Sequence, residues 1–158
     1  MQGFYTEEIR QHGKRIGFDV VTLDGIRGPL ARVGDVHQND GRAYRVGQYN
    51  VKLHSFEHIA LPSLRKKPSV SCVYVIDEIG KMEMFSERFV HEVRDLLENQ
   101  RTTVLTTIPA ARGKPIPFVE EIRHRTDALL FEVTKENRDQ LVDKIVQSTL
   151  QSHEYYNA

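Results

Sequence analysis

Two adjacent carboxylates, Asp77 and Glu78, follow an apolar segment and carry the clearest chemical signal in the sequence. The preceding residues 70–76 are almost continuously apolar, which is typical of a strand buried on both faces of a parallel sheet. Ligands of open α/β sheets bind beyond the carboxyl ends of such strands, so both carboxylates would lie at the ligand-binding edge. One could hold a divalent cation while the other activates a water molecule as a general base. The alternative is a strand that simply ends in solvated acidic residues.

The elements that would position this pair alternate between strand and helix patterns in the second half of the chain. Strands are also predicted over residues 102–108 and 128–133. Helices are predicted to follow the capping residues Ser86 and Thr134, and a shorter helix is predicted over residues 117–125. Because strands alternate with helices, the pattern indicates βαβ units and a parallel sheet.

The first half of the chain is rich in aromatic, β-branched and threonine residues, which favours extended structure. Residues 3–9 and 16–23 are predicted to form a β-hairpin around a turn at residues 11–14. Residues 24–29 are predicted to be a loop, because two glycines and a proline interrupt the pattern. A short strand is expected over residues 44–51. Ser55 is the expected cap of a helix reaching residue 66, with Pro62 causing a kink or an early end.

Composition limits the classes of protein that fit. The chain has 158 residues, 39% of them hydrophobic, and its 22 basic and 22 acidic residues balance. This balance argues against specific nucleic-acid binding or a membrane surface as partner. The single cysteine, Cys72, excludes a disulfide within the chain and any multi-cysteine metal site. The sequence contains no apolar run of membrane-spanning length and no secretory signal pattern, so we expect an intracellular, cytoplasmic protein.

The segment ending in Asp77 and Glu78 also matches the Walker B pattern, in which the Asp holds magnesium and the Glu polarises an attacking water. Together with motifs elsewhere in one order, it resembles the small, thermostable-type P-loop NTPase family. The motifs lie at residues 3–8, 15–19, 77–83, 107–109 and 134–138, and the resemblance extends from Gly3 to about Gln147. It implies a RecA/AAA-like α/β sandwich with a mostly parallel sheet plus the N-terminal hairpin. We expect one domain over residues 1–151, followed by a frayed tail at 152–158.

The chain departs from the family at the phosphate loop. Family members begin with a strand, a G-x-x-G-x-G-K-T-T loop and a helix, whereas only Met1 and Gln2 precede the matching region here. No G-x-x-x-x-G-K-[ST] occurs among the 158 residues, so we expect a truncated form that lacks the first strand and phosphate loop and is inactive alone. Such a chain could instead be a non-catalytic nucleotide-binding or regulatory module.

The resemblance implies roles for individual residues. Asp77 would be the magnesium ligand and Glu78 the general base. Lys81 would offset charge on the transferring phosphate, or be a solvated lysine. Thr107 would orient the water, or bond to its own backbone. The nucleotide-binding set would include a Walker B segment made of Val73, Tyr74, Val75, Ile76, Asp77, Glu78, Ile79 and Gly80.

Two residues at the start of the last predicted helix complete the expected nucleotide-binding set. Asn137 and Arg138 would border the nucleotide base, or be polar helix-start residues without a ligand. Substrates implied by the family are ATP, GTP, CTP and UTP, hydrolysed to the diphosphate with Mg²⁺ as cofactor.

A third hypothesis is a zinc hydrolase. His54, Glu57 and His58 fit the H-x-x-E-H pattern of inverted zinc proteases. Zinc ligation requires both histidines on one face of a continuous helix. With Ser55 as the helix cap, His54 would lie outside the helix and the two rings would not converge. The sequence indicates no third ligand.

Overall fold

The computed structural model describes residues 1–34, 44–65 and 71–155. It opens with the predicted hairpin, in which β1 (Gln2–Gln11) pairs antiparallel with β2 (Lys14–Thr22). The turn residues His12 and Gly13 both have positive φ, at 49° and 76°. Two positive φ angles give a turn whose twist matches that of the flanking strands. The hairpin prediction is therefore confirmed.

A third strand occupies much of the predicted loop. β3 (Arg27–Val33) pairs antiparallel with β2 and includes Pro29, so the loop prediction for residues 24–29 is wrong beyond residue 26. Proline has no N–H to donate and is tolerated in sheets mainly at edges and bulges. Pro29 lies opposite Asp19, where the register shifts between Phe18 and Asp19, so the irregular pairing accommodates the missing donor.

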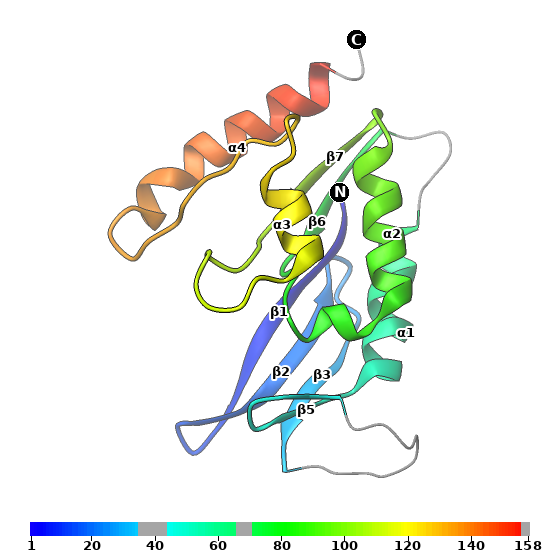
Figure 1. Ribbon diagram of the computed structural model, residues 1–158, viewed down its shortest axis with the longest axis vertical. Coiled ribbons are helices and arrows are strands. Elements are labelled where there is room, and N and C mark those ends of the chain that lie inside the picture. Colours follow the sequence, from blue (N-terminus) through cyan, green and yellow to red (C-terminus); the bar gives the residue numbers. More distant parts are fainter. Residues whose placement is uncertain (35–43, 66–70, 156–158) are drawn as a thin grey trace.

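Within the described residues, the sheet has seven strands in the order β4-β5-β3-β2-β1-β6-β7 (Figure 1). β4 (Arg45–Val46) and β5 (Tyr49–Val51) form a small hairpin where one strand was predicted. β1, β6 (Cys72–Ile76) and β7 (Thr102–Thr106) are mutually parallel. The other pairings are antiparallel, so the sheet is mixed and the expectation of a mostly parallel sheet is wrong. Three of these antiparallel pairs, β1–β2, β2–β3 and β4–β5, are consecutive in the chain and joined by short turns, which can connect only antiparallel neighbours.

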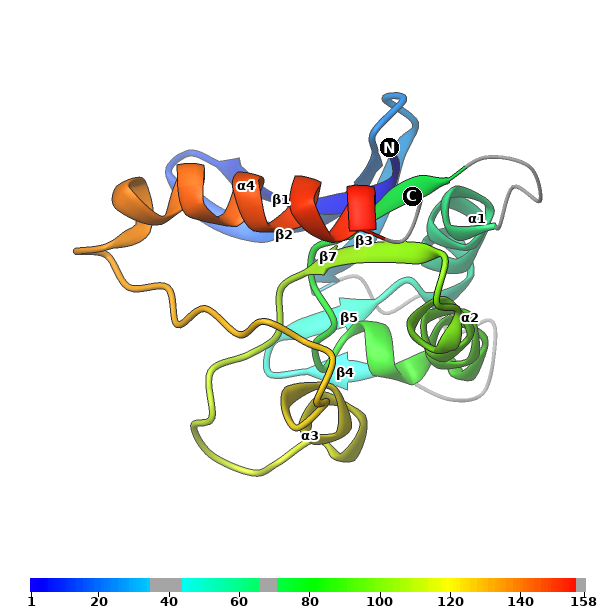
Figure 2. The ribbon, with the colours of Figure 1, turned by 90° about the horizontal axis from the view of Figure 1, so that it is seen from above.

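Helices cover both faces of the sheet (Figure 2). They are α1 (Leu53–Leu64), α2 (Glu87–Glu98), α3 (Pro117–Arg123) and α4 (Arg138–Tyr155). The first three lie on one face, and α4 crosses the other face over β6 and β7. In the part of the chain that the structure describes, no helix is both long and apolar enough to cross a membrane.

The predicted capping residue is correct for α2 and wrong for α1. Ser86 caps α2 as predicted, because its hydroxyl accepts a hydrogen bond from the amide of Phe89 at 3.0 Å. Ser55 does not cap α1, which begins two residues earlier. Pro62 lies in the last turn of α1, and the helix ends at Leu64 as an early stop requires. Residues 66 and 70, expected at element ends, lie outside the described residues.

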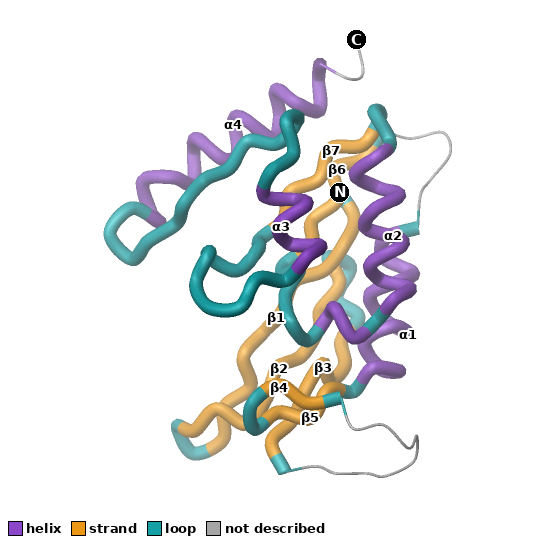
Figure 3. The backbone as a smooth tube through the Cα atoms, in the orientation of Figure 1, coloured by secondary structure: helices purple, strands orange, loops and turns teal. Residues whose placement is uncertain are grey.

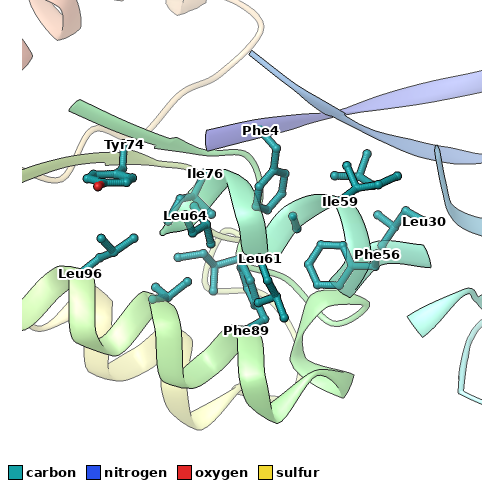
Figure 4. Close-up of a cluster of buried hydrophobic side chains, with 14 of the residues drawn as sticks. Phe4, Leu30, Phe56, Ile59, Leu61, Leu64, Tyr74, Ile76, Phe89 and Leu96 are labelled. Carbon is teal, nitrogen blue, oxygen red and sulfur yellow. The ribbon is translucent and has the colours of Figure 1, made fainter. Parts of the chain in front are cut away.

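The core lies between the sheet and helices α1 and α2 (Figure 4). Phe4 of β1, Phe56 of α1 and Phe89 of α2 meet there, with ring centroids 5.2 to 5.9 Å apart. Tyr74 and Ile76 of β6 join this core, as the apolar pattern of that strand predicted. β6 is thus held by packing as well as by its two strand neighbours, which fixes the position of the residues that follow it.

Residues 128–133 do not form the predicted strand, and Figure 3 shows the segment as loop. Its apolar side chains are largely exposed, with Leu129 at 70% and Leu130 at 60%. A strand needs a neighbour to satisfy its backbone, and in the described sheet the order ends at β7. The apolar pattern alone therefore does not make this segment a strand.

α4 also differs from expectation. The Thr134 hydroxyl accepts from the amides of Glu136 and Asn137, just before the helix begins at Arg138. The helix continues to Tyr155, beyond the point where a frayed tail was expected to start. None of its side chains is buried, so its apolar stripe contacts the sheet only partly.

Candidate active site

The carboxyl ends of β6 and β7 bring Asp77 and Thr107 into contact. The Thr107 hydroxyl donates a hydrogen bond to Oδ1 of Asp77 at 2.5 Å. Backbone bonds reinforce the junction, since the Thr107 amide donates to the Ile76 carbonyl and the Ile79 amide donates to the Thr107 carbonyl. Two residues far apart in sequence thereby form one polar edge of the sheet, where ligands of α/β proteins bind.

β1 supports the same edge from the other side. The Asp77 amide donates to the carbonyl of Phe4 at 3.1 Å, so the parallel pairing of β1 and β6 extends to the first carboxylate. Gly3 has a φ of +112°, and a Cβ there would lie 1.9 Å from the carbonyl oxygen of Val75. Only glycine allows this approach, so Gly3 is required for β1 to pair closely beside β6.

Glu78 follows Asp77 directly, and its side chain is exposed at the edge of the sheet. Surrounding protein atoms nevertheless displace part of its hydration, and the charge of Asp77 lies beside it. Both effects raise the pKa of Glu78 above its ordinary value. A carboxylate with a raised pKa is a stronger base, which suits the role predicted for this residue.

A third carboxylate, Glu83, belongs to this site, although sequence reasoning assigned it no role. It starts a short 3₁₀ helix, Glu83–Phe85, and only 3% of its surface is exposed. Burial raises the pKa of Glu83 to about 7, and the negative charges of Glu78 and Asp77 add to the effect. Its Oε2 accepts a hydrogen bond from the Gly80 amide at 3.1 Å. The available signal was its place in the motif of residues 77–83.

Lys81 is exposed on the loop beyond Gly80. It lines a pocket of about 400 Å³ together with Arg45, Met84, Phe85 and Ile116 among others. Asp77, Glu78 and Thr107 are not among the residues that line this pocket, so Lys81 is close to the carboxylates in sequence but does not share a pocket with them. Its ammonium has no ion-pair partner among the residues described. Its role toward phosphate stays a prediction.

Asn137 and Arg138 lie at the start of α4 and make local contacts. The Asn137 side chain accepts from the Thr134 amide and donates to the Glu132 carbonyl. Arg138 pairs with its neighbour Asp139 at 3.8 Å. These contacts are those of helix-start residues, and they do not join Asn137 or Arg138 to the polar edge formed by Asp77 and Thr107.

The carboxylate edge offers oxygen donors of the kind that Mg²⁺ prefers. Asp77 is half-buried at the strand end with the Thr107 hydroxyl beside it. Mg²⁺ in phosphate-transfer sites is commonly held by one or two carboxylates, with water and substrate phosphates completing the octahedron. No group of three or more His, Cys, Asp or Glu side chains arranged for metal binding occurs in the described ranges. One carboxylate therefore fits Mg²⁺ only as part of a shared site with a nucleotide.

The histidine pair differs from expectation. Because α1 begins at Leu53, His54 lies inside the helix, and its ring stacks on that of His58 with centroids 6.4 Å apart. The argument that the two rings would not converge was therefore wrong. Within the described residues, however, no third metal-binding side chain joins them. The structure therefore places both histidines on one continuous helix, but the described residues do not supply the third ligand that a zinc site needs.

Comparison with known proteins assigns the family. Residues 1–146 match the family model described as NTPase. This chain belongs to the NTPase family. It is 56% identical over 150 residues to the human cancer-related nucleoside-triphosphatase, covering 92% of this chain and 79% of that protein. It is 41% identical over 144 residues to the nucleoside-triphosphatase THEP1 of Thermotoga sp. (strain RQ2), covering 91% and 78%.

Two solved structures of nucleoside triphosphatases are similar in fold to this chain. The solution structure of a human cancer-related nucleoside triphosphatase superimposes with a TM-score of 0.81 at 54% identity, covering 96% of this chain and 82% of that one. The crystal structure of THEP1 from Aquifex aeolicus gives 0.80 at 35% identity, covering 94% and 83%. The resemblance drawn from the sequence motifs is thereby confirmed.

Proposed function

We propose that this NTPase-family chain hydrolyses nucleoside triphosphates to the diphosphate and phosphate, with Mg²⁺, once a phosphate-binding loop completes the site. The observation that carries the proposal is the hydrogen bond between Thr107 and Asp77 at the carboxyl edge of two parallel strands. It supports a fixed carboxylate at the position where α/β proteins bind ligands, beside a second carboxylate with a raised pKa.

In the proposed reaction, Asp77 would hold Mg²⁺, which supplies charge neutralisation at the phosphate oxygens when bound. Glu78 would accept a proton from the attacking water, and the oxygen of that water would form the new bond to the terminal phosphorus. The bond from that phosphorus to the bridging oxygen breaks, leaving the diphosphate. Burial and the neighbouring Asp77 raise the pKa of Glu78, which brings its basicity closer to what proton abstraction near neutral pH requires.

The remaining predicted residues have supporting roles in the proposal. The hydroxyl of Thr107 lies near enough to Asp77 to orient the carboxylate and a water beside it. Lys81, exposed next to Gly80, would approach the terminal phosphate. Val73 to Gly80 would form the nucleotide-binding edge. Asn137 and Arg138 would border the base only after giving up the local contacts that now engage them.

The test joins a family-type strand, phosphate loop and helix to the chain before Gly3 and measures phosphate release. We expect Mg²⁺-dependent hydrolysis of ATP and GTP. Glu78→Gln should lower the rate of hydrolysis by roughly 10²- to 10⁴-fold, while nucleotide affinity stays unchanged. Asp77→Ala should also weaken the dependence on Mg²⁺. Glu154→Gln, at an exposed position near the end of α4, is the matched control and should leave the rate unchanged.

The alternative function is a non-catalytic nucleotide-binding or regulatory module. Under that alternative, the extended protein would bind Mg²⁺-nucleotide but release no phosphate above the level of its Glu78→Gln variant. That result would contradict the hydrolysis proposal and leave the binding function in its place.

A further inference from the structure

A buried carboxylate, that of Glu83, lies close enough to the proposed general base, Glu78, for their charges to interact. Glu83 is 3% exposed, and the cost of removing its charge from water raises its pKa to about 7. Acidic side chains are rarely buried to this extent unless they are paired or hydrogen-bonded. Its carboxylate is hydrogen-bonded to its own backbone and, beyond its own residue, accepts a hydrogen bond from the Gly80 amide at 3.1 Å. Outside its own residue, the group that the Glu83 carboxylate binds is therefore the Gly80 backbone.

Gly80 is held at both ends of its backbone. Its amide donates to the Glu83 carboxylate, and its carbonyl accepts from the amide of Met84 at 3.1 Å. The Ser86 amide in turn donates to the Glu83 carbonyl at 3.0 Å, and the Ser86 side chain caps α2. The turn that follows Glu78 is thus anchored, through Glu83, to the start of a helix packed in the core.

The Glu78 side chain lies against Gly80. A Cβ at residue 80 would lie 2.2 Å from Oε1 of Glu78 and 3.0 Å from its carboxyl carbon. A hydrogen at this position is what allows the carboxyl group to lie there. The position of the Gly80 backbone therefore determines where the Glu78 carboxylate can lie at the edge of the sheet.

We infer that Glu83 is a positioning residue that holds the Gly80 peptide so that the Glu78 carboxylate is presented toward the water it activates. This inference rests on the proposed function in assigning Glu78 as the base. Glu83 itself, being buried behind the turn, would not touch the nucleotide. Its contribution would be geometric, and small errors in the position of a catalytic group can cost large factors in rate.

The first test uses the 158-residue chain and amide NMR, so it does not depend on turnover. Glu83→Gln keeps an oxygen acceptor for Gly80, whereas Glu83→Met removes it at similar volume. We expect the Gly80 amide shift and its slow hydrogen exchange to survive in the Gln variant and to be lost in the Met variant. Retention of both properties in the Met variant would overturn the inference.

Gly80→Ala tests the second contact without altering Glu83. The obstructing atom is the end of a flexible side chain, so the added methyl should displace the Glu78 carboxyl rather than unfold the turn. We expect the side-chain carboxyl ¹³C signal of Glu78 to shift while the fold is retained. An unchanged Glu78 signal would show that the carboxyl does not lie on Gly80 and would contradict the inference.

The last test uses the protein extended with the phosphate loop. Glu83→Met and Gly80→Ala should each lower kcat by roughly 10- to 100-fold with KM unchanged. Glu83→Gln, which keeps the oxygen acceptor, should retain most of the native kcat. If Glu78→Gln abolishes turnover but Glu83→Met does not lower it, the positioning role is wrong and the proposed function stands. If turnover does not depend on Glu78, the proposed function fails, and the NMR results still decide whether Glu83 holds Gly80.

Discussion

The hydroxyl of Thr107 lies 2.5 Å from Oδ1 of Asp77, although thirty positions of sequence separate the two residues. The contact exists because β6 and β7 are parallel neighbours that end at the same edge, with Ile76 paired to Thr106. Asp77 is therefore oriented by the adjacent strand as well as by its own backbone bond to Phe4. A carboxylate fixed in this way presents its remaining oxygen in a defined direction.

We expect Thr107→Val to disturb Asp77 more than the overall fold. The substitution removes a hydrogen bond to a charged acceptor at an exposed site, so the free energy of unfolding should fall by about 1 kcal/mol. Urea unfolding would measure the loss. Thr107→Ser keeps the hydroxyl and is the control. Equal stability of the Val and Ser variants would show that the hydroxyl contributes nothing to holding Asp77.

The 158 residues by themselves should show no nucleoside-triphosphate hydrolysis above background. Phosphoryl transfer depends mainly on positioning and charge stabilisation, and no phosphate-loop sequence is present to supply them. Phosphate release from highly purified protein would be compared with that of its own Glu78→Gln variant. A rate that disappears in this variant would mean that another part of the chain holds the triphosphate.

Nucleotide binding by the extended protein should show little base selectivity. In the proposed site, Asp77, Glu78 and Thr107 would act on phosphate and Mg²⁺ rather than on the base, and the candidate base neighbour Asn137 is engaged in local hydrogen bonds. Competition among ATP, GTP, CTP and UTP would measure the preference. A hundredfold preference for one base, equivalent to about 2.7 kcal/mol, would contradict the prediction.

The contribution of Glu83 to the stability of the chain should fall with rising pH. Its folded-state pKa, about 7, lies above the ordinary value of 4.5, so the folded chain binds this proton more tightly than the unfolded chain. The resulting stabilisation is complete below pH 4.5 and is lost as pH rises through 7. Relative to Glu83→Gln, the native chain should lose roughly 3 kcal/mol of unfolding free energy over this range.

Chemical denaturation at a series of pH values would measure this difference. Glu78 has a raised pKa and gives a pH dependence of the same sign, whereas the lowered pKa values of Glu8, Asp127 and Glu136 give the opposite sign, and all four groups are present in both proteins. The comparison therefore isolates Glu83. A constant difference between the two proteins from acid to neutral pH would show that the buried carboxyl does not titrate in this range.

The apolar stripe of α4 should promote self-association. Val146 is 50% exposed and Val142 is 55% exposed on this stripe, beside β7 at the end of the described strand order. Contiguous exposed apolar surface next to a strand edge favours association. Val146→Glu should lower the average mass in sedimentation experiments at high concentration. Gln147→Glu adds the same charge next to the stripe and should change the mass less, and equal effects would contradict the prediction.

Local patterns in the sequence determined the features that depend on neighbours along the chain. The N-terminal hairpin, the buried strand before Asp77 and the Ser86 cap of α2 all follow from residue period and turn or capping chemistry. The motif around Asp77 and Glu78, taken together with the other motifs in their order along the chain, likewise indicated the family, because residue types and their order do not depend on the tertiary arrangement.

Only the tertiary structure decided features that depend on partners distant in sequence. Residues 128–133 have a strand pattern but no strand neighbour in the described sheet, and β3 forms despite Pro29 because β2 accepts an irregular register. Glu83 has the same side chain as any surface glutamate, and its raised pKa arises from burial behind Gly80. Whether a segment finds a strand partner, and whether a carboxyl group is buried, depends on residues far away in the sequence, so a local sequence pattern does not specify either one.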